Sequence, residues 1–218
     1  MNVTLRARTT GVGELAGLSV GEILAYVARV SNPSNQMNHE TAAKLLSYCL
    51  RNQHWSVFES ASLTMEIETS RAIAQQILRH RSFTFQEFSQ RYAEALDFEI
   101  YEARRQDTKN RQNSIDDLDE DTKAWFEAIQ DGVNRESLRL YRAALNAGIA
   151  KEQARFLLPL STQTRLYMTG NIRNWITYCQ TRCKPGTQLE HLEIAEACRS
   201  ILLAECPELE AAFEPAAV

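Results

Sequence analysis

The sequence predicts a single α+β domain, rich in helix, in which a small antiparallel sheet packs against several helices. Glycine and proline are scarce, with 8 and 5 residues in a chain of 218, which leaves few irregular stretches and favours helix. Segments with the two-residue period of strands are interspersed with segments of helical period. Neither a linker nor an internal repeat interrupts them, so we expect one domain over residues 1–218.

The first elements follow from the spacing of apolar residues. Val3, Leu5 and Ala7 alternate with polar residues, which predicts an opening strand. Apolar residues at helical spacing then predict one helix over residues 19–30 and a second over residues 40–51. The chain is therefore expected to begin with a strand and two helices.

A strand and a capped helix are expected next. Apolar and polar residues alternate over residues 62–68, the pattern of a half-buried strand. Ser70 is placed to cap a helix that runs through Leu78. A further strand is expected around residues 98–101. The polar stretch 104–121 has neither period, which predicts a solvated loop or excursion.

The last third of the chain is predicted to be helical. Apolar residues recur at helical spacing over residues 125–145, and Gly148 is placed to end that helix. A short helix over residues 151–158 and two longer helices over residues 170–182 and 188–205 are expected to follow.

Composition and charge exclude several classes of protein. There are 24 Lys and Arg against 28 Asp and Glu, a net charge of −4, which argues against a general nucleic-acid binder and makes any positive site local. No run of 18 apolar residues and no signal-peptide core occurs, so we expect no membrane partner and a cytoplasmic location, or the host cytoplasm for a viral protein. The five cysteines lack paired CxxC spacing, which suits reduced thiols and predicts no metal site.

Cations gather between residues 71 and 91, although the chain as a whole is acidic. They are all Arg or His, and the planar fork of arginine matches a phosphate or a carboxylate. Phe83, Phe85 and Phe88 are interleaved with them, so the stretch suits a flat anionic ligand such as a nucleotide or flavin. A solvated helix end that complements the helix dipole is the alternative. The cations are Arg71, Arg79, His80, Arg81 and Arg91.

A second polar concentration lies between residues 152 and 182. Asn171 and Arg173 flank a predicted helix start, where free backbone N–H groups favour anions. Arg155 lies on a largely apolar segment, where it is costly to bury unless an anion meets it. A salt bridge from Arg155 to Glu152 is the alternative.

The sequence does not favour covalent nucleophilic catalysis. It has no P-loop, HExxH or GxGxxG sequence. His54 lies among aromatic residues, where a structural histidine is more common than a catalyst. No cysteine has the His-rich surroundings of an activated thiolate, although Cys179 and Cys183 flank Arg182.

The string RHRSFTFQEFSQRY, from Arg79 to Tyr92, resembles the RHR-x7-S signature of the flavin-dependent thymidylate synthases, the ThyX family. Further segments occur in the order that this family has them and extend the resemblance over roughly residues 25–206. They are Ala28 to Ser31, His54 to Glu59, Glu152 to Leu160, Thr169 to Trp175, and Arg182 with Gln188 and Glu190.

The resemblance implies an enzyme that methylates dUMP reductively to dTMP, in the de novo supply of that nucleotide. Methylenetetrahydrofolate would give the one-carbon unit and leave as tetrahydrofolate. FAD that NADPH has reduced would give the hydride. No cysteine adduct is expected. The cofactor carries the redox step, while the protein binds, orients and supplies charge.

The resemblance also implies roles for individual residues. Arg182 would be catalytic, because a fixed guanidinium favours loss of the uracil N3 proton and raises electron density at C5. The residues expected to bind dUMP are Gln76, Arg79, Glu87, Ser89, Gln90, Arg91, Arg155 and Arg182. Those expected to bind FAD are Ser31, His54, Ser56, Glu59, Arg79, His80, Arg81, Glu87, Asn171, Ile172, Arg173 and Thr177.

In this family the active site is shared between chains of a homotetramer, so we expect an inactive monomer. Thr177, Ser60 and Gln90 depart from the residues usual in the family, which bears on flavin affinity or turnover. Two alternatives stay open from the sequence. One is a flavin- and nucleotide-binding protein without synthase activity, and the other is a protein that binds single-stranded nucleic acid by stacking and phosphate contacts.

Overall fold

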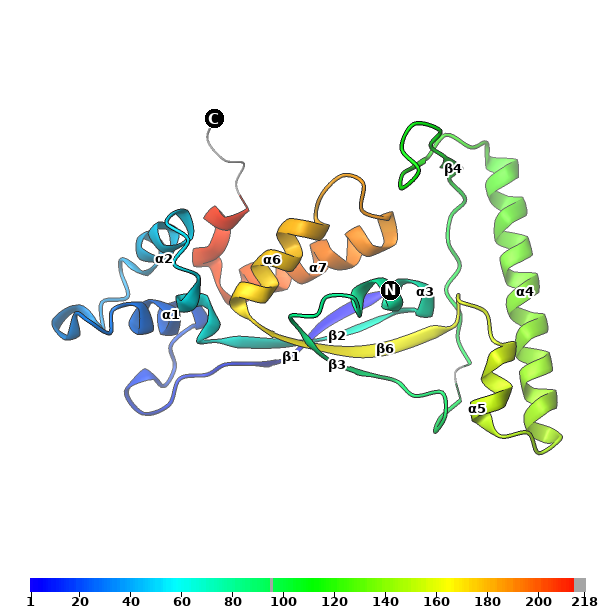
Figure 1. Ribbon diagram of the computed structural model, residues 1–218, viewed down its shortest axis with the longest axis horizontal. Helices are drawn as coiled ribbons and strands as arrows, with labels where there is room; N and C mark the ends of the chain where they lie inside the picture. The colour runs from blue at the N-terminus through cyan, green and yellow to red at the C-terminus, as the bar shows by residue number, and fades with distance from the viewer. Residues whose placement is uncertain (95, 214–218) are drawn as a thin grey trace.

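The centre of the computed structural model, which describes residues 1–94 and 96–213, is an antiparallel sheet of four strands in the order β1-β2-β6-β3 (Figure 1). The central strands β2 and β6 pair along their whole length, from Ser62 opposite Asn171 to Ser70 opposite Gln163. The bounds of the strands are β1 (Asn2–Arg8), β2 (Ser62–Ser70), β3 (Thr84–Glu87) and β6 (Gln163–Asn171).

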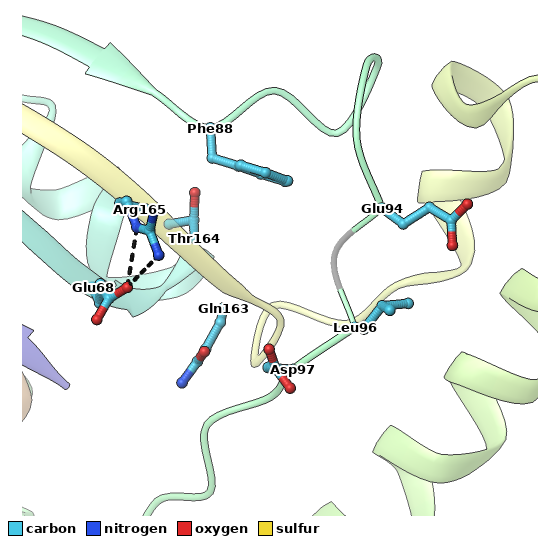
Figure 2. A pocket seen from close by; sticks show the side chains of 8 residues that line it. All are labelled: Glu68, Phe88, Glu94, Leu96, Asp97, Gln163, Thr164 and Arg165. Atoms are coloured by element: carbon cyan, nitrogen blue, oxygen red, sulfur yellow. Dashed lines mark hydrogen bonds and ion pairs between the residues drawn. The ribbon is translucent and has the colours of Figure 1, made fainter.

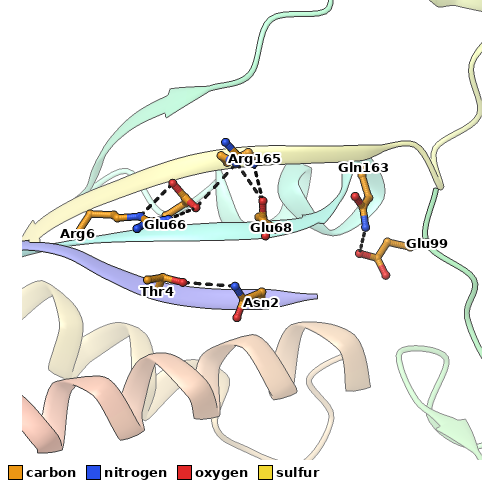
Figure 3. A network of polar contacts seen from close by, with 8 residues as sticks. All are labelled: Asn2, Thr4, Arg6, Glu66, Glu68, Glu99, Gln163 and Arg165. Carbon is orange, nitrogen blue, oxygen red and sulfur yellow. Dashed lines mark hydrogen bonds and ion pairs between the residues drawn. The ribbon is translucent and has the colours of Figure 1, made fainter. Parts of the chain in front are cut away.

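The two faces of this sheet differ in polarity. Leu63, Met65 and Ile67 of β2 alternate with polar residues and are buried in the main core, as are Leu166 and Met168 of β6. The other face carries charged pairs between neighbouring strands (Figure 3). One apolar face and one polar face are typical of an antiparallel sheet that is covered on one side.

Figure 3 shows ion pairs on the polar face, in which Arg165 contacts both Glu66 and Glu68. Arg6 of β1 donates to Glu66 of β2 at 2.8 Å, and Arg165 of β6 donates to Glu68 of β2 at 2.7 Å. These pairs join β1 and β6 to the central strand across the surface that the helices leave uncovered.

Helices α6 and α7 cover the apolar face of the sheet, with α3 beside them, α1 and α2 at one end and α4 and α5 at the other (Figure 1). Tyr141, Ala144 and Ala154 form a small second cluster between α4 and α5. The α-helices are α1 (Val20–Ala28), α2 (Ala42–Arg51), α3 (Arg71–Ile77), α4 (Glu120–Asn146), α5 (Lys151–Ala154), α6 (Ile172–Arg182) and α7 (Leu189–Glu205). The 3-10 helices are η1 (Gly13–Leu15), η2 (Pro33–Asn35), η3 (Trp55–Glu59), η4 (Arg155–Leu157) and η5 (Pro207–Ala212).

Side-chain caps begin the helices next to the candidate site. The Ser70 hydroxyl accepts a hydrogen bond from the Ile73 amide at 3.4 Å, which confirms the predicted cap of α3. The Asn171 side chain accepts from the Asn174 amide at 3.0 Å and begins α6. Both caps lie where a strand passes directly into a helix, so they fix how α3 and α6 leave the sheet.

The helix-rich α+β fold is confirmed, but the structure differs from the expected elements in several places. Strands β3 and β6 were not predicted, and α6 begins at Ile172 because residues 170 and 171 end strand β6. The strand expected over residues 98–101 is reduced to one bridge between Phe98 and Thr162. The solvated loop or excursion expected over residues 104–121 contains the short hairpin of β4 (Arg105–Gln106) and β5 (Ser114–Ile115), and α4 already begins at Glu120.

Membrane-spanning helices are not found within residues 1–94 and 96–213, where no helix combines sufficient length with sufficient apolar character.

Candidate active site

Arg182, at the end of α6, is hydrogen-bonded to His80, which lies three residues beyond α3. The Arg182 Nε donates to His80 Nε2 at 2.9 Å. The His80 ring also packs edge-on against Tyr178, with ring centroids 4.9 Å apart. The fold therefore makes the predicted catalytic arginine a direct neighbour of the histidine in the Arg79–Arg81 motif.

His80 is a neutral acceptor in this pair. Burial lowers the pKa of His80 to about 4, and the charge of Arg182 acts in the same direction. Because Nε2 accepts the hydrogen bond, the ring proton is on Nδ1. No carboxylate among the described residues forms an ion pair with Arg182, so its guanidinium keeps an unneutralised charge.

A run of hydrogen bonds joins α3 to the start of α7. The Gln76 Nε2 donates to Gln188 Oε1 at 2.6 Å, and the Gln188 Nε2 donates to Glu190 Oε2 at 2.8 Å. Arg104 binds the other Glu190 oxygen at 2.5 Å. Burial by itself would raise the pKa of Glu190, but hydrogen bonds from Arg104 and Gln188 hold it below its usual range.

His191 belongs to the same run, although the sequence patterns do not single it out. Its Nε2 lies 3.1 Å from the Tyr178 hydroxyl, and its Nδ1 lies 3.3 Å from Gln76 Oε1. The one sequence signal is spacing, because His191 falls at helical intervals from Ile194 and Ala195 on the buried face of α7. Its partners, 13 and 115 residues away, are set by tertiary contacts.

A second group of predicted residues gathers where η3 meets the start of α6. Arg173 forms an ion pair with Glu59 at 2.5 Å, and its guanidinium lies 5.8 Å from the ring centroid of Trp55. The Thr177 hydroxyl donates to the Arg173 carbonyl at 3.0 Å, so this hydroxyl has no hydrogen left to donate to a ligand. His54 and Ser56 are exposed on η3 and its flank, beside this group.

Ile172 differs from the other residues expected at the flavin. Its side chain is fully buried in the main core, so only its backbone is free to face a ligand at the start of α6.

A third group lies beyond β3, next to α5. Arg91 forms an ion pair with Glu152 at 3.1 Å. Arg155 donates to the backbone carbonyl of Glu152 at 3.2 Å and not to its carboxylate, which excludes the simple salt bridge considered from the sequence. Gln90 is only 4% exposed, and its Nε2 is buried without a hydrogen-bond partner. Ser89 precedes it on the same segment.

Glu87, at the end of β3, is held by residues of the sheet and of α3. Its Oε1 accepts from the Thr164 hydroxyl at 3.0 Å and lies 3.4 Å from the Arg71 guanidinium. The carboxylate therefore has a fixed orientation on the edge strand of the sheet.

The remaining predicted residues are exposed. Arg79 and Arg81 flank His80, and within the described part of the chain neither forms an ion pair. Ser31 lies on the connection between α1 and α2. A single chain thus brings Gln76, His80 and Arg182 together. The group around Arg173, at the start of α6, and the group around Arg91, beyond β3, remain separate from each other within that chain.

A separate hollow of about 180 Å³ opens between β6 and the segment after β3 (Figure 2). Besides Glu68, which Arg165 neutralises, two of its side chains are carboxylates, Glu94 and Asp97, so the hollow does not suit a phosphate. None of the predicted site residues lines it. Its lining consists of Glu68, Phe88, Glu94, Leu96, Asp97, Gln163, Thr164 and Arg165.

The described residues contain no candidate metal site, because nowhere among them do three His, Cys, Asp or Glu side chains lie close enough together to hold an ion. The fold and the site together define a class of protein. It is a helix-covered antiparallel sheet in which arginines without an ion pair in the described residues lie beside a neutral histidine, which suits an anionic, aromatic ligand.

Comparisons with known proteins identify the family within this class. The family model described as thymidylate synthase complementing protein matches residues 19–208. The chain is 56% identical over 197 residues to the flavin-dependent thymidylate synthase of Synechocystis sp., covering 90% of this chain and 91% of that protein. It is 53% identical over 194 residues to the probable flavin-dependent thymidylate synthase of Paramecium bursaria Chlorella virus 1, covering 88% and 90%. The chain belongs to the flavin-dependent thymidylate synthase family.

A solved structure has the same fold. The UMP/dUMP methylase PolB from Streptomyces cacaoi, bound with 5-Br dUMP, matches with a TM-score of 0.83 at 23% identity. The match covers 97% of this chain and 93% of that chain. At this identity the likeness shows a common architecture of sheet and helices.

Proposed function

We propose that this chain converts dUMP to dTMP, with methylenetetrahydrofolate as the one-carbon donor and with FAD, reduced by NADPH, as the source of the hydride. The observation that carries the proposal is the Arg182–His80 pair within a chain of this family. Tetrahydrofolate is the second product. The residues of the chain supply binding, orientation and charge, while the flavin supplies the redox chemistry.

Arg182 would stabilise negative charge on the uracil ring. No carboxylate of the described residues competes for its guanidinium, and the neutral His80 ring fixes its Nε. A preoriented cation that needs no reorganisation lowers the energy of an anion that develops beside it. This geometry favours loss of the N3 proton and higher electron density at C5.

The side chains around the motif fit a flavin dinucleotide. Arg79 and Arg81 are exposed cations without an ion pair in the described part of the chain, which suits a pyrophosphate. The capped start of α6 at Asn171 lies beside Trp55 and Arg173, where amides and an aromatic ring are available. We assign FAD to this region, with Glu87 between the flavin and the nucleotide.

The nucleotide phosphate is assigned to Ser89, Arg91 and Arg155 beyond β3. Arg91 and Arg155 both contact Glu152, and the buried Gln90 amide lacks a partner. Figure 1 shows α5, which carries Glu152, alongside α4 and apart from α6. We therefore infer that a homotetramer completes each site, with Arg182 from one chain and the phosphate-binding group from another.

One experiment separates this function from its alternatives. The purified protein is reconstituted with FAD, and NADPH oxidation and dTMP are followed with and without dUMP and methylenetetrahydrofolate. Formation of dTMP that needs both substrates supports the synthase. A yellow protein that binds dUMP but makes no dTMP would indicate loss of synthase activity. A colourless protein whose oligonucleotide affinity falls steeply with salt would indicate the nucleic-acid binder.

A further inference from the structure

His191 is a fully buried histidine that hydrogen-bonds to Gln76, a residue expected to bind dUMP, and has no exposed surface of its own. It lies in the first turn of α7 between Tyr178 of α6 and Gln76 of α3, and its exposed fraction is 0%. A buried imidazole is costly unless both nitrogens are satisfied, and here each has one partner.

The direction of every hydrogen bond in this run follows from Glu190. Arg104 keeps Glu190 ionised, so its carboxylate can only accept, and Gln188 must turn its Nε2 toward it. The Gln188 Oε1 then accepts from Gln76 Nε2. Each amide orientation is thus determined by the previous bond.

The same logic fixes the tautomer of His191. Because the Gln76 Nε2 is used on Gln188, the atom that Gln76 presents to His191 is its Oε1, an acceptor. His191 must therefore donate from Nδ1, which leaves Nε2 as an acceptor for the Tyr178 hydroxyl.

Burial keeps the ring in the neutral form that this arrangement requires. It lowers the pKa of His191 to about 4, and the charge of Arg182 acts in the same direction. At pH 7 the ring carries a single proton, on Nδ1.

We propose that His191, held by Tyr178, is a positioning residue that fixes the side-chain amide of Gln76 for binding of dUMP. One N–H and one lone pair of that amide are used on Gln188 and His191, so the other N–H and lone pair keep a constant orientation toward the nucleotide. The inference rests on the proposed role of Gln76 at dUMP.

The test compares three variants of the assembled, FAD-loaded enzyme by calorimetric titration with dUMP. His191→Leu removes the donor to Gln76, and we expect its Kd for dUMP to rise about tenfold, the equivalent of one hydrogen bond. His191→Asn places an amide donor near the position of Nδ1, and we expect it to recover most of the affinity. Tyr178→Phe frees the His191 tautomer, and we expect it to resemble His191→Leu.

A buried control separates positioning from packing. Ile194→Ala, on the same face of α7, also weakens the core but has no part in the run of hydrogen bonds. We expect it to lower thermal stability while its dUMP Kd stays within twofold of the wild type. FAD content should be equal in all four variants.

The outcomes are distinguishable. If the wild type binds no dUMP, the proposed function fails and this inference fails with it. If the wild type binds dUMP but His191→Leu binds it equally well, or if His191→Asn is as weak as His191→Leu, the positioning role is overturned while the function stands.

Discussion

At the scale of single residues, the contact between Arg182 and His80 sets the surroundings of the arginine proposed to be catalytic. Among the described residues the arginine is held by a neutral ring and not by a carboxylate, so its charge would be available to the proposed substrate. The Arg173 guanidinium, in contrast, is paired with Glu59. Two arginines of one helix are thus suited to different tasks.

Replacing Arg182 by alanine should reduce dTMP formation by about 10²–10³-fold, because it removes the charge that stabilises the developing anion. Flavin content should fall by less than twofold, since no flavin contact is assigned to this side chain. Arg139→Ala, on the exposed face of α4, serves as a control with activity near that of the wild type. Equal loss of flavin and of dTMP formation would mean that Arg182 has another role.

The two buried histidines predict sensitivity to acid. Burial lowers the pKa of both His80 and His191 to about 4, below the ordinary value of 6.5. Between pH 6.5 and pH 4 the unfolded chain binds more protons than the folded chain, so the free energy of unfolding falls as the pH falls through this window.

Denaturant unfolding at pH 5, 6 and 7 measures this dependence. We expect His191→Asn to reduce the slope of stability against pH by about 1 kcal/mol per pH unit, because one titrating group is removed. Identical slopes for the wild type and the variant would show that folding does not lower the pKa of His191.

At the scale of elements, β6 leads directly into α6 at a close contact. A Cβ built at Gly170 would lie 2.5 Å from the ring of Phe83, so only glycine lets the ring of the neighbouring segment reach the sheet. Asn171 then caps α6 in the next position. This junction sets the direction in which α6 leaves the sheet, and so the positions of Arg173 and Arg182 on that helix.

Gly170→Ala should therefore destabilise the protein by about 1–3 kcal/mol, since the new methyl group forces the Phe83 ring to move. Gly132→Ala is the matched control, because nothing lies within 4 Å of its Cβ position and alanine favours the middle of α4 by about 1 kcal/mol. Chemical denaturation of both variants measures the difference, and stabilisation by Gly170→Ala would contradict the contact.

At the scale of the whole molecule, α4 carries an apolar stripe that the described part of the chain leaves uncovered. Trp125, Ile129 and Val133 follow at intervals of four residues and are 62%, 42% and 49% exposed. Such a contiguous stripe is typical of a surface that another chain covers. It agrees with the proposed homotetramer.

Ile129→Arg should weaken assembly, because a charge at the centre of a buried interface is costly. Sedimentation velocity should show smaller species, together with loss of dTMP formation. Asn146→Arg, at an exposed polar residue of the same helix, should stay assembled and active. An active monomer of Ile129→Arg would overturn both the interface and the shared site.

Shared sites also predict complementation between chains. Arg182→Ala and Arg91→Ala homotetramers should each be inactive, whereas mixed tetramers formed by joint unfolding and reassembly should regain about a quarter of the activity at equal amounts, because one site in four receives two intact groups. Assays of dTMP before and after mixing measure this, and no gain would place both arginines of a site on one chain.

Much of the fold could be predicted because its signals are local. Residues 62–68 show the period of a strand, and Ser70 is a cap that acts on an amide three residues away. The arginines and phenylalanines around His80 likewise indicate an anionic, aromatic ligand without any knowledge of their neighbours.

The missed elements depend on distant partners. Strand β6 alternates Thr164, Leu166 and Met168 with exposed residues, but its pairing with β2 joins segments about a hundred residues apart. The same holds for His191, whose role appears only when α3 and α6 are packed against α7. The sequence by itself determined the family, the caps and the chemistry of the arginine cluster, because these lie in residue types and short spacings. Only the tertiary structure decided which arginine is neutralised, which histidine is buried and how each amide is turned, because charge and hydrogen bonding depend on the atoms brought within a few ångströms by folding.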